Sequence, residues 1–148
     1  RSEAKQLIDG FFETFPKVHD YMEHSKQVAR AQGYAETVFH RRRYLPDINS
    51  RNAVVRNYAE RNAINAPIQG SAADIIKVAM IRIHRRFEEL GLKSKMILQV
   101  HDELNFSVFP EEKDTVEKIV IGEMQNAYQL SVPLIADCGW GANWLEAH

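Results

Sequence analysis

Residues 96–108 read MILQVHDELNFSV, and this stretch decides the fold class. On each side of the central triplet His101-Asp102-Glu103, an apolar residue stands at every second position, which is the period of two typical of β-strands. The triplet contains no glycine, proline or asparagine that would explain an ordinary hairpin turn. The stretch therefore predicts an antiparallel hairpin that carries two adjacent carboxylates at its tip. The residues predicted to share one face of its first strand are Met96, Leu98 and Val100.

The strongest helical pattern lies directly before this hairpin. Its apolar residues recur three or four positions apart and form one stripe. They are Ala72, Ile75, Ile76, Ala79, Met80, Ile83, Phe87 and Leu90. Ser71 and Asp74 match the S-x-x-D capping box at the start of a helix, and Gly91 is a typical helix end. The pattern predicts a helix whose stripe packs into the core.

Further helices and strands flank these elements. In chain order, they are helices at about 4–15 and 18–32, strands at 34–39 and 41–46, a helix at 51–62, a helix from Pro110, and a last strand at 132–138. Asn65-Ala66-Pro67 predicts a break between helices, because a residue before proline avoids the α-helical region. The whole pattern indicates an α+β class, with an antiparallel sheet backed by helices.

The bulk composition is that of a soluble globular protein. Of its residues, 45% are hydrophobic and 26% are charged. The length of 148 residues is enough for one compact domain with its own core. No apolar run is long enough to span a membrane. The single cysteine, Cys138, fits a reducing compartment and is expected to be buried in the last strand. The chain begins at Arg1 without an initiator methionine, which suggests a fragment or a processed product.

Positive charge is concentrated between residues 41 and 61, although the formal net charge of the whole chain is −1. In this segment six arginines stand against two carboxylates, Asp47 and Glu60, so the local net charge is +4. The arginines are Arg41, Arg42, Arg43, Arg51, Arg56 and Arg61. Such a basic stripe could face nucleic-acid phosphates, and the alternative is a solvated helix face held by salt bridges.

The adjacent carboxylates Asp102 and Glu103 are candidate metal ligands. Mg²⁺ binds one or two carboxylates together with water and substrate phosphate oxygens, and paired ions can drive phosphoryl transfer. Neighbouring residues on a strand point to opposite faces, so the two carboxylates need not serve the same site. The alternative interpretation is a solvated polar turn.

Arg61, Asn65 and Gln69 form a second candidate site, because residues four apart lie roughly along one line of a helix. One cation and two amides suit the hydrogen-bond acceptors of the DNA minor groove, which are shared by different base pairs. The alternative is a helix break in which the amides satisfy loop backbone groups.

Four segments resemble the family A DNA polymerases in order and spacing. They are residues 43–48 (RYLPDI), 59–74 (AERNAINAPIQGSAAD), 99–104 (QVHDEL) and 132–144 (VPLIADCGWGANW). The second and third segments are highly specific in combination, and the similarity covers essentially the whole chain. One departure is His40, which stands where many family members have glycine before the arginine run.

The resemblance implies a partial right-hand polymerase fold. Residues 1–45 would form the C-terminal part of the fingers, and residues 46–148 the C-terminal part of the palm. It implies that Asp102 ligates the catalytic metals, that Glu103 supports it, and that His101 lies near the primer terminus.

The same resemblance implies that Arg61, Asn65 and Gln69 contact the template–primer near the active site, largely through the minor groove. The basic stripe adds further candidates for DNA binding. They are Arg41, Arg42 and Arg43.

An intact enzyme of this family is a DNA-directed DNA polymerase that joins a primer 3′-hydroxyl to a deoxynucleoside triphosphate, with two Mg²⁺ ions. The expected partners are primer–template DNA, the nucleotide and the remainder of the polymerase chain, with no membrane. A second metal-binding aspartate, a fingers helix that grips the triphosphate, and the thumb are expected upstream of Arg1. The isolated chain is therefore expected to be inactive, and the parent to lie in the bacterial cytoplasm, associated with the nucleoid.

Two other functions stay open at this point. One is a non-catalytic nucleic-acid-binding module that reuses the palm segment, and the other is a metal-dependent nuclease built on Asp102 and Glu103. An upstream D-Y-S-type strand and a fingers helix in the parent protein would favour the polymerase, and their absence would favour the binding module.

Overall fold

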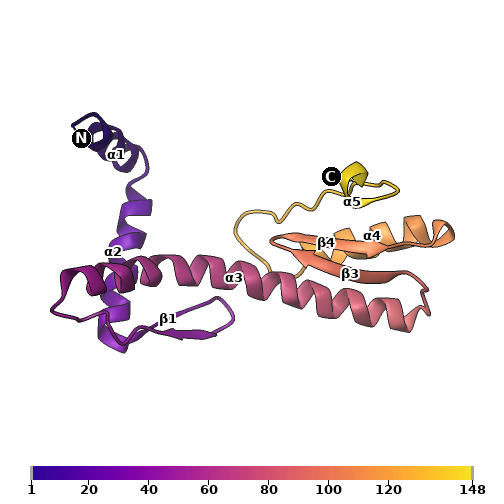
Figure 1. Cartoon of the computed structure of the whole chain (residues 1–148), viewed down its shortest axis with the longest axis horizontal. Coiled ribbons are helices and arrows are strands. Elements are labelled where there is room, and N and C mark those ends of the chain that lie inside the picture. The colour runs from indigo at the N-terminus through magenta and orange to yellow at the C-terminus, as the bar shows by residue number, and fades with distance from the viewer. Residues whose placement is uncertain (1, 148) are drawn as a thin grey trace. The chain divides into compact units, whose positions relative to one another are not determined.

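The computed structural model describes residues 2–147, so Arg1 and His148, which the predicted fingers and palm segments include, lie outside the described residues. In chain order, its elements are α1 (Ser2–Thr14), α2 (Pro16–Gln32), β1 (Tyr34–Glu36), β2 (Arg42–Tyr44), α3 (Ala53–Glu89), β3 (Lys95–Val100), β4 (Glu103–Ser107), the 3₁₀ turn η1 (Pro110–Glu112), α4 (Lys113–Gln125) and α5 (Trp144–Ala147) (Figure 1). Helices with two small antiparallel sheets confirm the α+β class. The chain forms two compact units, which divide after Ser71.

The first unit begins with two helices and a strand pair, as the sequence predicted. Pro16 is the first residue of α2, where its missing N–H costs no hydrogen bond. Gly33 ends this helix with φ +80° and donates its N–H to the Ala29 carbonyl at 2.8 Å. β1 and β2 then pair antiparallel, with Ala35 opposite Arg43.

The first unit has a small core of its own. It is formed by α2, the β1–β2 hairpin with the segment after it, and the beginning of α3. Its buried members are Ala29, Ala35, Leu45, Ile48, Ala59, Ala63 and Ala66. The Tyr21 hydroxyl donates to the Ile64 carbonyl at 3.1 Å and adds a polar tie between α2 and α3. This packing determines which side of α3 is covered in the first unit.

The helix α3 is continuous, so the predicted break at Asn65-Ala66-Pro67 is wrong. Pro67 removes one intrahelical hydrogen bond, but Ala63 and Ala66 beside it are buried in the core. This tertiary packing outweighs the local preference against helix. The two helices predicted on either side of the break are one helix.

Ser71 does not cap the start of a helix, contrary to the prediction from the S-x-x-D pattern. It lies inside α3, where its hydroxyl donates to the Pro67 carbonyl. The predicted end at Gly91 is confirmed, because this residue has φ +61° and directly follows the last turn of the helix. The next N–H, of Leu92, reaches back to the Phe87 carbonyl at 3.0 Å and closes the helix end.

The second unit is built on the β3–β4 hairpin, which confirms the hairpin prediction. Met96 pairs with Phe106 and Leu98 pairs with Asn105, so Ile97 is an extra residue that forms a bulge. The bulge interrupts the expected alternation. Leu98 is 46% exposed, whereas Met96 packs against the core.

The second part of α3 and the helix α4 pack against this hairpin (Figure 1). The buried residues of this core are Ala79, Ile83, Phe87, Val116 and Ala127. The middle of the predicted apolar stripe is therefore buried in the core, whereas Leu90 at its end is 50% exposed. Across residues 2–147, none of the helices combines the length and apolarity that crossing a membrane requires.

Residues 132–138 form no strand, so the predicted last strand is wrong. A strand needs a neighbour for its backbone N–H and C=O groups, and none of the strands in the described range pairs with this segment. Ile135 is 77% exposed, and Cys138, which was expected in the core, is also exposed. The tail is held instead by Trp140, whose Nε1 donates to Glu117 Oε2 at 3.1 Å.

Candidate active site and nucleic-acid interface

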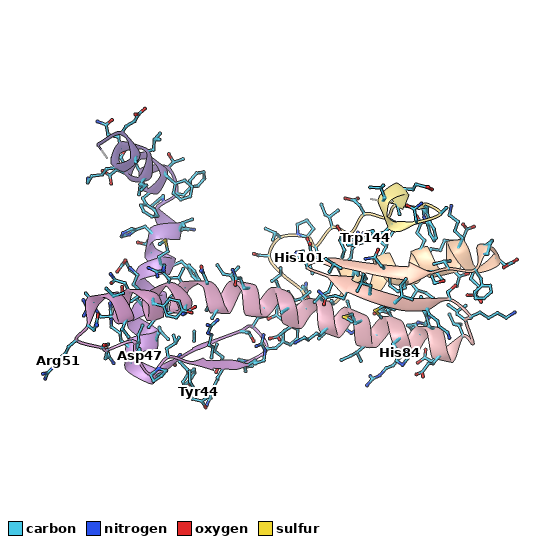
Figure 2. All side chains as sticks on the ribbon, viewed as in Figure 1. Tyr44, Asp47, Arg51, His84, His101 and Trp144 are labelled. Atoms are coloured by element: carbon cyan, nitrogen blue, oxygen red, sulfur yellow. The ribbon has the colours of Figure 1, made fainter. Side chains whose placement is uncertain are left out.

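The candidate catalytic residues lie at the turn of the β3–β4 hairpin, where Figure 2 labels His101. Val100 pairs with Glu103, which leaves His101 and Asp102 as the two turn residues. His101 has φ +55°, a left-handed conformation that is uncommon outside glycine. Gln99 Nε2 donates to the His101 carbonyl at 2.6 Å and holds the turn. Unusual backbone of this kind is concentrated at functional sites, and here it presents Asp102 at the tip.

Asp102 and Glu103 line the same cavity. Asp102 is exposed in the turn, whereas Glu103 is half-buried as the first residue of β4. The cavity has a volume of about 620 Å³ and is lined by residues of β4, α4 and the tail. Because Asp102 lies in the turn and not in a strand, strand alternation does not separate the two carboxylates.

The donor chemistry of this pair fits a hard cation. Mg²⁺ is often held by only one or two carboxylates, together with water and substrate phosphate oxygens. Within residues 2–147, no group of three or more His, Cys, Asp or Glu side chains is placed to hold a metal ion. Asp102 and Glu103 remain the candidate metal ligands of the described chain.

Arg61, Asn65 and Gln69 lie on α3 at intervals of four residues, and all three are exposed. Each step of four residues turns the side-chain direction by about 40°, so the three side chains form a slowly winding row. The Arg61 guanidinium lies 5.9 Å from the centroid of the Tyr58 ring. The alternative of amides at a helix break does not apply, because α3 has no break at these positions.

The opposite side of this part of α3 is covered. Ala59 and Ala63 are 3% and 0% exposed. They point about 160–200° around the helix from Arg61. The row therefore projects from the uncovered side of a helix whose other side is fixed in the core of the first unit.

Part of the basic stripe is used within the first unit. Arg42 Nε lies 3.0 Å from Glu36 Oε2, and Arg41 Nη2 donates to the Gly70 carbonyl at 3.1 Å. Hydrogen bonds from His40 and then from Arg42 keep the pKa of Glu36 below its ordinary value. Here the salt-bridged interpretation of the stripe applies.

Other arginines of the stripe face outward. Arg43 and Arg51 are exposed, and Figure 2 labels Arg51 in the segment before α3. Arg56 is an exception, because it is half-buried and donates to the Ser50 carbonyl at 2.9 Å. The exposed members, with Arg61, leave positive charge on the surface that could meet phosphates.

Sequence reasoning missed the residues that join the β1–β2 loop to α3. They are Thr37, Gly70 and Ser71. A signal was present, because glycine lowers the stability of a helix and its lack of a side chain lets another segment come close. The predicted break at Pro67 obscured it, since Gly70 then lay outside any predicted helix.

Comparisons with known proteins agree over nearly the whole chain. Residues 1–146 match the family described as DNA polymerase family A. Relatives named DNA polymerase I are 54% identical over 147 residues in Streptococcus pneumoniae serotype 4 and 51% identical over 146 residues in Caldicellulosiruptor bescii. Each alignment covers 99% of this chain, but the chain spans only 17% of the length of either relative.

Among solved structures, the POL domain of Pol1 from M. smegmatis, in complex with DNA primer-template and dNTP, matches with a TM-score of 0.97. The two chains are 49% identical, and the match covers 99% of this chain and 26% of that one. Sequence and structure thus confirm the resemblance that the motifs indicated. The chain belongs to DNA polymerase family A.

Proposed function

We propose that the protein containing this chain is a DNA-directed DNA polymerase that extends a primer with deoxynucleoside triphosphates. The observation that carries the proposal is the match of 99% of this chain to part of a polymerase domain bound to DNA primer-template and dNTP. Relatives named DNA polymerase I, about half identical to this chain, support it. In this proposal, residues 1–45 belong to the fingers and residues 46–148 to the palm.

Asp102 is the proposed ligand for two Mg²⁺ ions, with Glu103 beside it and His101 next to the primer terminus. When bound, such ions supply Lewis-acid charge to the attacking and leaving oxygens. The hydrogen bond from Gln99 to the His101 carbonyl holds the backbone of the turn that carries Asp102, which lowers the entropy cost of assembling the site. Its exposure leaves the carboxylate accessible to nucleotide and primer.

Arg61, Asn65 and Gln69 are proposed to contact the minor groove of the primer–template. Acceptors in this groove are nearly the same for all Watson–Crick pairs, so the row can test pair geometry without reading sequence. The exposure of all three side chains supports this role. Of the predicted DNA-binding run from Arg41 to Arg43, the exposed Arg43 is free to add positive charge for contacts to phosphates, while Arg41 and Arg42 bind within the first unit.

Asp102→Asn in the full-length protein tests the proposed catalytic role. The variant should lose about 100-fold or more of primer extension, because the lost charge acts mainly in the transition state. DNA affinity and melting temperature should stay near those of the wild type. Asp114→Asn changes an exposed carboxylate on α4 and is the matched control. Normal extension by the Asp102 variant would show that the catalytic carboxylate is assigned wrongly.

The same assay separates the polymerase from the two other functions. A non-catalytic binding module would bind the primer–template but leave the primer unextended in the wild type. A nuclease built on the hairpin carboxylates would shorten the primer in Mg²⁺, and Asp102→Asn would remove the shortening.

A further inference from the structure

The loop between β1 and β2 packs against α3, and residues 37–41 are called the docking loop below. Arg41 Nη2 donates to the Gly70 carbonyl at 3.1 Å. The Val38 N–H donates to Ser71 Oγ at 3.0 Å. One side-chain donor and one backbone donor of the loop therefore bind two consecutive residues of the helix.

The docking loop and α3 come close together at Gly70. A Cβ atom at position 70 would lie 2.6 Å from Thr37 Cγ2, which is closer than such atoms come without one of them moving. Thr37 is only 7% exposed, and its β-branched side chain has few rotamers to choose from. The contact between loop and helix thus depends on the absence of a side chain at position 70.

Hydrogen bonds that Thr37 makes within the docking loop limit how far the loop can move. Thr37 Oγ1 accepts the N–H groups of Phe39 at 3.3 Å and Arg41 at 3.2 Å, and the Thr37 N–H donates to the Arg41 carbonyl at 3.0 Å. His40 has φ +65°, and its Nδ1 lies 2.7 Å from Glu36 Oε1. A loop with these bonds presents one fixed surface to the helix.

The turn of α3 under the docking loop is weakened by its own sequence. Pro67 has no N–H to donate to the carbonyl of Ala63, and Gly70 has a poor helix propensity. Prolines and glycines are common sites of helix bending. Gln69 lies between these two residues, so the direction of its side chain depends on how the turn is held.

Gln69 projects away from the docking loop. At 100° per residue, its side chain points about 100° from Gly70 and about 160° from both Pro67 and Ser71. The Ser71 hydroxyl, which accepts from the loop, also donates to the Pro67 carbonyl and extends the support across the whole turn. The loop thus holds one side of the turn while Gln69 is exposed on the other.

We propose that the docking loop is a positioning element for Gln69, with Thr37 and Arg41 as the positioning residues. By fixing the turn from Pro67 to Ser71, the loop sets the angle at which the Gln69 amide meets the minor groove. The inference rests on the DNA contact proposed above for Gln69, and it names the residues that set the geometry of this contact.

Gly70→Ala in the full-length protein tests the inference, because the new methyl group must displace the Thr37 methyl. Extension from matched primer termini should fall about two- to tenfold, which corresponds to one neutral hydrogen bond. Extension from mismatched termini, where the contact is not formed, should stay unchanged. Thr37→Ser removes the methyl and keeps the hydroxyl, so adding it to Gly70→Ala should restore most of the matched extension.

Gly122→Ala is the matched control for a glycine-to-alanine change in a helix. An added Cβ at Gly122 in α4 has no neighbour within 4 Å, and this variant should extend both kinds of terminus normally. A packing role without positioning predicts a lower melting temperature and equal losses at matched and mismatched termini for Gly70→Ala. That result would overturn the inference.

Gln69→Ala distinguishes this inference from the contact on which it rests. The inference is supported when Gly70→Ala has no further effect in a Gln69→Ala background. Suppose instead that Gln69→Ala reduces matched extension, and that Gly70→Ala in this background reduces it further by the factor seen in the wild type. The DNA contact then stands and the positioning role is refuted. If Gln69→Ala changes neither kind of extension, the DNA contact itself is refuted and the positioning role falls with it.

Ser71→Ala tests the same inference if Gly70→Ala fails to fold, because it adds no atom that could clash with Thr37. It removes the hydroxyl that joins the Val38 N–H to the Pro67 carbonyl. The expected result is a loss at matched termini alone, which disappears in the Gln69→Ala background. A loss of equal size at both kinds of terminus would contradict the inference.

Discussion

Two histidines in left-handed backbone conformation lie at the two turns on which the candidate site depends. His101 has φ +55° and His40 has φ +65°. Histidine is one of the residues that tolerate this region best after glycine. Each is also held by a neighbour, since Gln99 donates to the carbonyl of His101 and the ring of His40 meets Glu36. The conformations persist because the surroundings impose them, at the carboxylate tip and at the docking loop.

Ile83 is the single residue whose truncation should most weaken the second unit. It is 0% exposed at the centre of the core formed by α3, α4 and the hairpin. Ile83→Ala should destabilise the protein by about 2–5 kcal/mol, because transfer energy is lost and a cavity is left. Ile81→Ala, at a 52% exposed position on the same helix, is the control and should cost far less. Denaturant midpoints compare the two variants, and equal losses would mean that Ile83 is not a core residue.

At the scale of elements, Glu112 of η1 fixes the base of the β3–β4 hairpin. Its carboxylate accepts the N–H of Lys93 at 2.9 Å, the N–H of Ser94 at 2.8 Å and the Ser94 hydroxyl at 2.6 Å. Ser94 Oγ also accepts the N–H of Phe109 at 3.0 Å, so both ends of the hairpin meet here. The backbone hydrogen bond from Lys93 and the bond from the Ser94 hydroxyl are the main reasons that the pKa of Glu112 lies below its ordinary value.

This pKa shift predicts how the stability of the hairpin depends on pH. A carboxyl group whose pKa is lower in the folded state contributes stability above its unfolded pKa, and loses it as the pH falls through the folded value. Glu112→Gln should therefore lower the melting temperature at pH 7, and its difference from the wild type should shrink below about pH 4.5. Glu111→Gln changes the exposed neighbour and should have little effect. A deficit of constant size from pH 7 to pH 3 would mean that the charge of Glu112 is not stabilising.

The elements differ in how far they could be predicted, and the difference follows from where their determinants lie. The β3–β4 hairpin is encoded locally, by alternation on both sides of a carboxylate turn. The continuity of α3 across Pro67 depends on the burial of Ala63 and Ala66 against residues distant in sequence, so the local proline rule failed. Residues 132–138 have an apolar, β-like composition, but the partner that a strand requires cannot be read from the segment itself.

The candidate site shows the same division between local and distant determinants. Asp102 and the row on α3 stand in specific motifs, and they could be named from the sequence. Their supports could not, because the contact between Thr37 and Gly70 exists only after the β1–β2 loop has packed against the helix. The bulge at Ile97 is similarly invisible in the alternation of residue types.

At the scale of the whole chain, each compact unit carries its own set of candidate residues. The row from Arg61 to Gln69 belongs to the unit Arg1–Ser71, and the carboxylate turn belongs to the unit Ala72–His148. Each unit has its own small core, and α3 contributes residues to both. The proposed contact to the primer–template and the proposed ligation of metal would therefore rest on separate sets of packing interactions.

The 148-residue chain also has features of a part that needs other protein around it. Large apolar side chains of α1 are exposed, with Leu7 at 72% and Phe11 at 48%. Exposed apolar patches of this kind usually mark an interaction surface. The described residues supply two candidate metal ligands, Asp102 and Glu103, whereas the phosphoryl transfer proposed here uses a pair of metal ions.

We therefore expect that these 148 residues by themselves do not extend a primer. Purified chain, incubated with primed template, deoxynucleoside triphosphates and Mg²⁺, should leave the primer at its original length, whereas the full-length protein extends it. The Asp102→Asn form of the isolated chain, prepared in the same way, detects contamination. Extension of equal size in both preparations comes from a host polymerase, because it does not depend on the candidate ligand. Extension by the unaltered chain that disappears with Asp102→Asn would contradict the prediction, because Asp102 and Glu103 would then suffice, with nucleotide and water, to hold the catalytic metal.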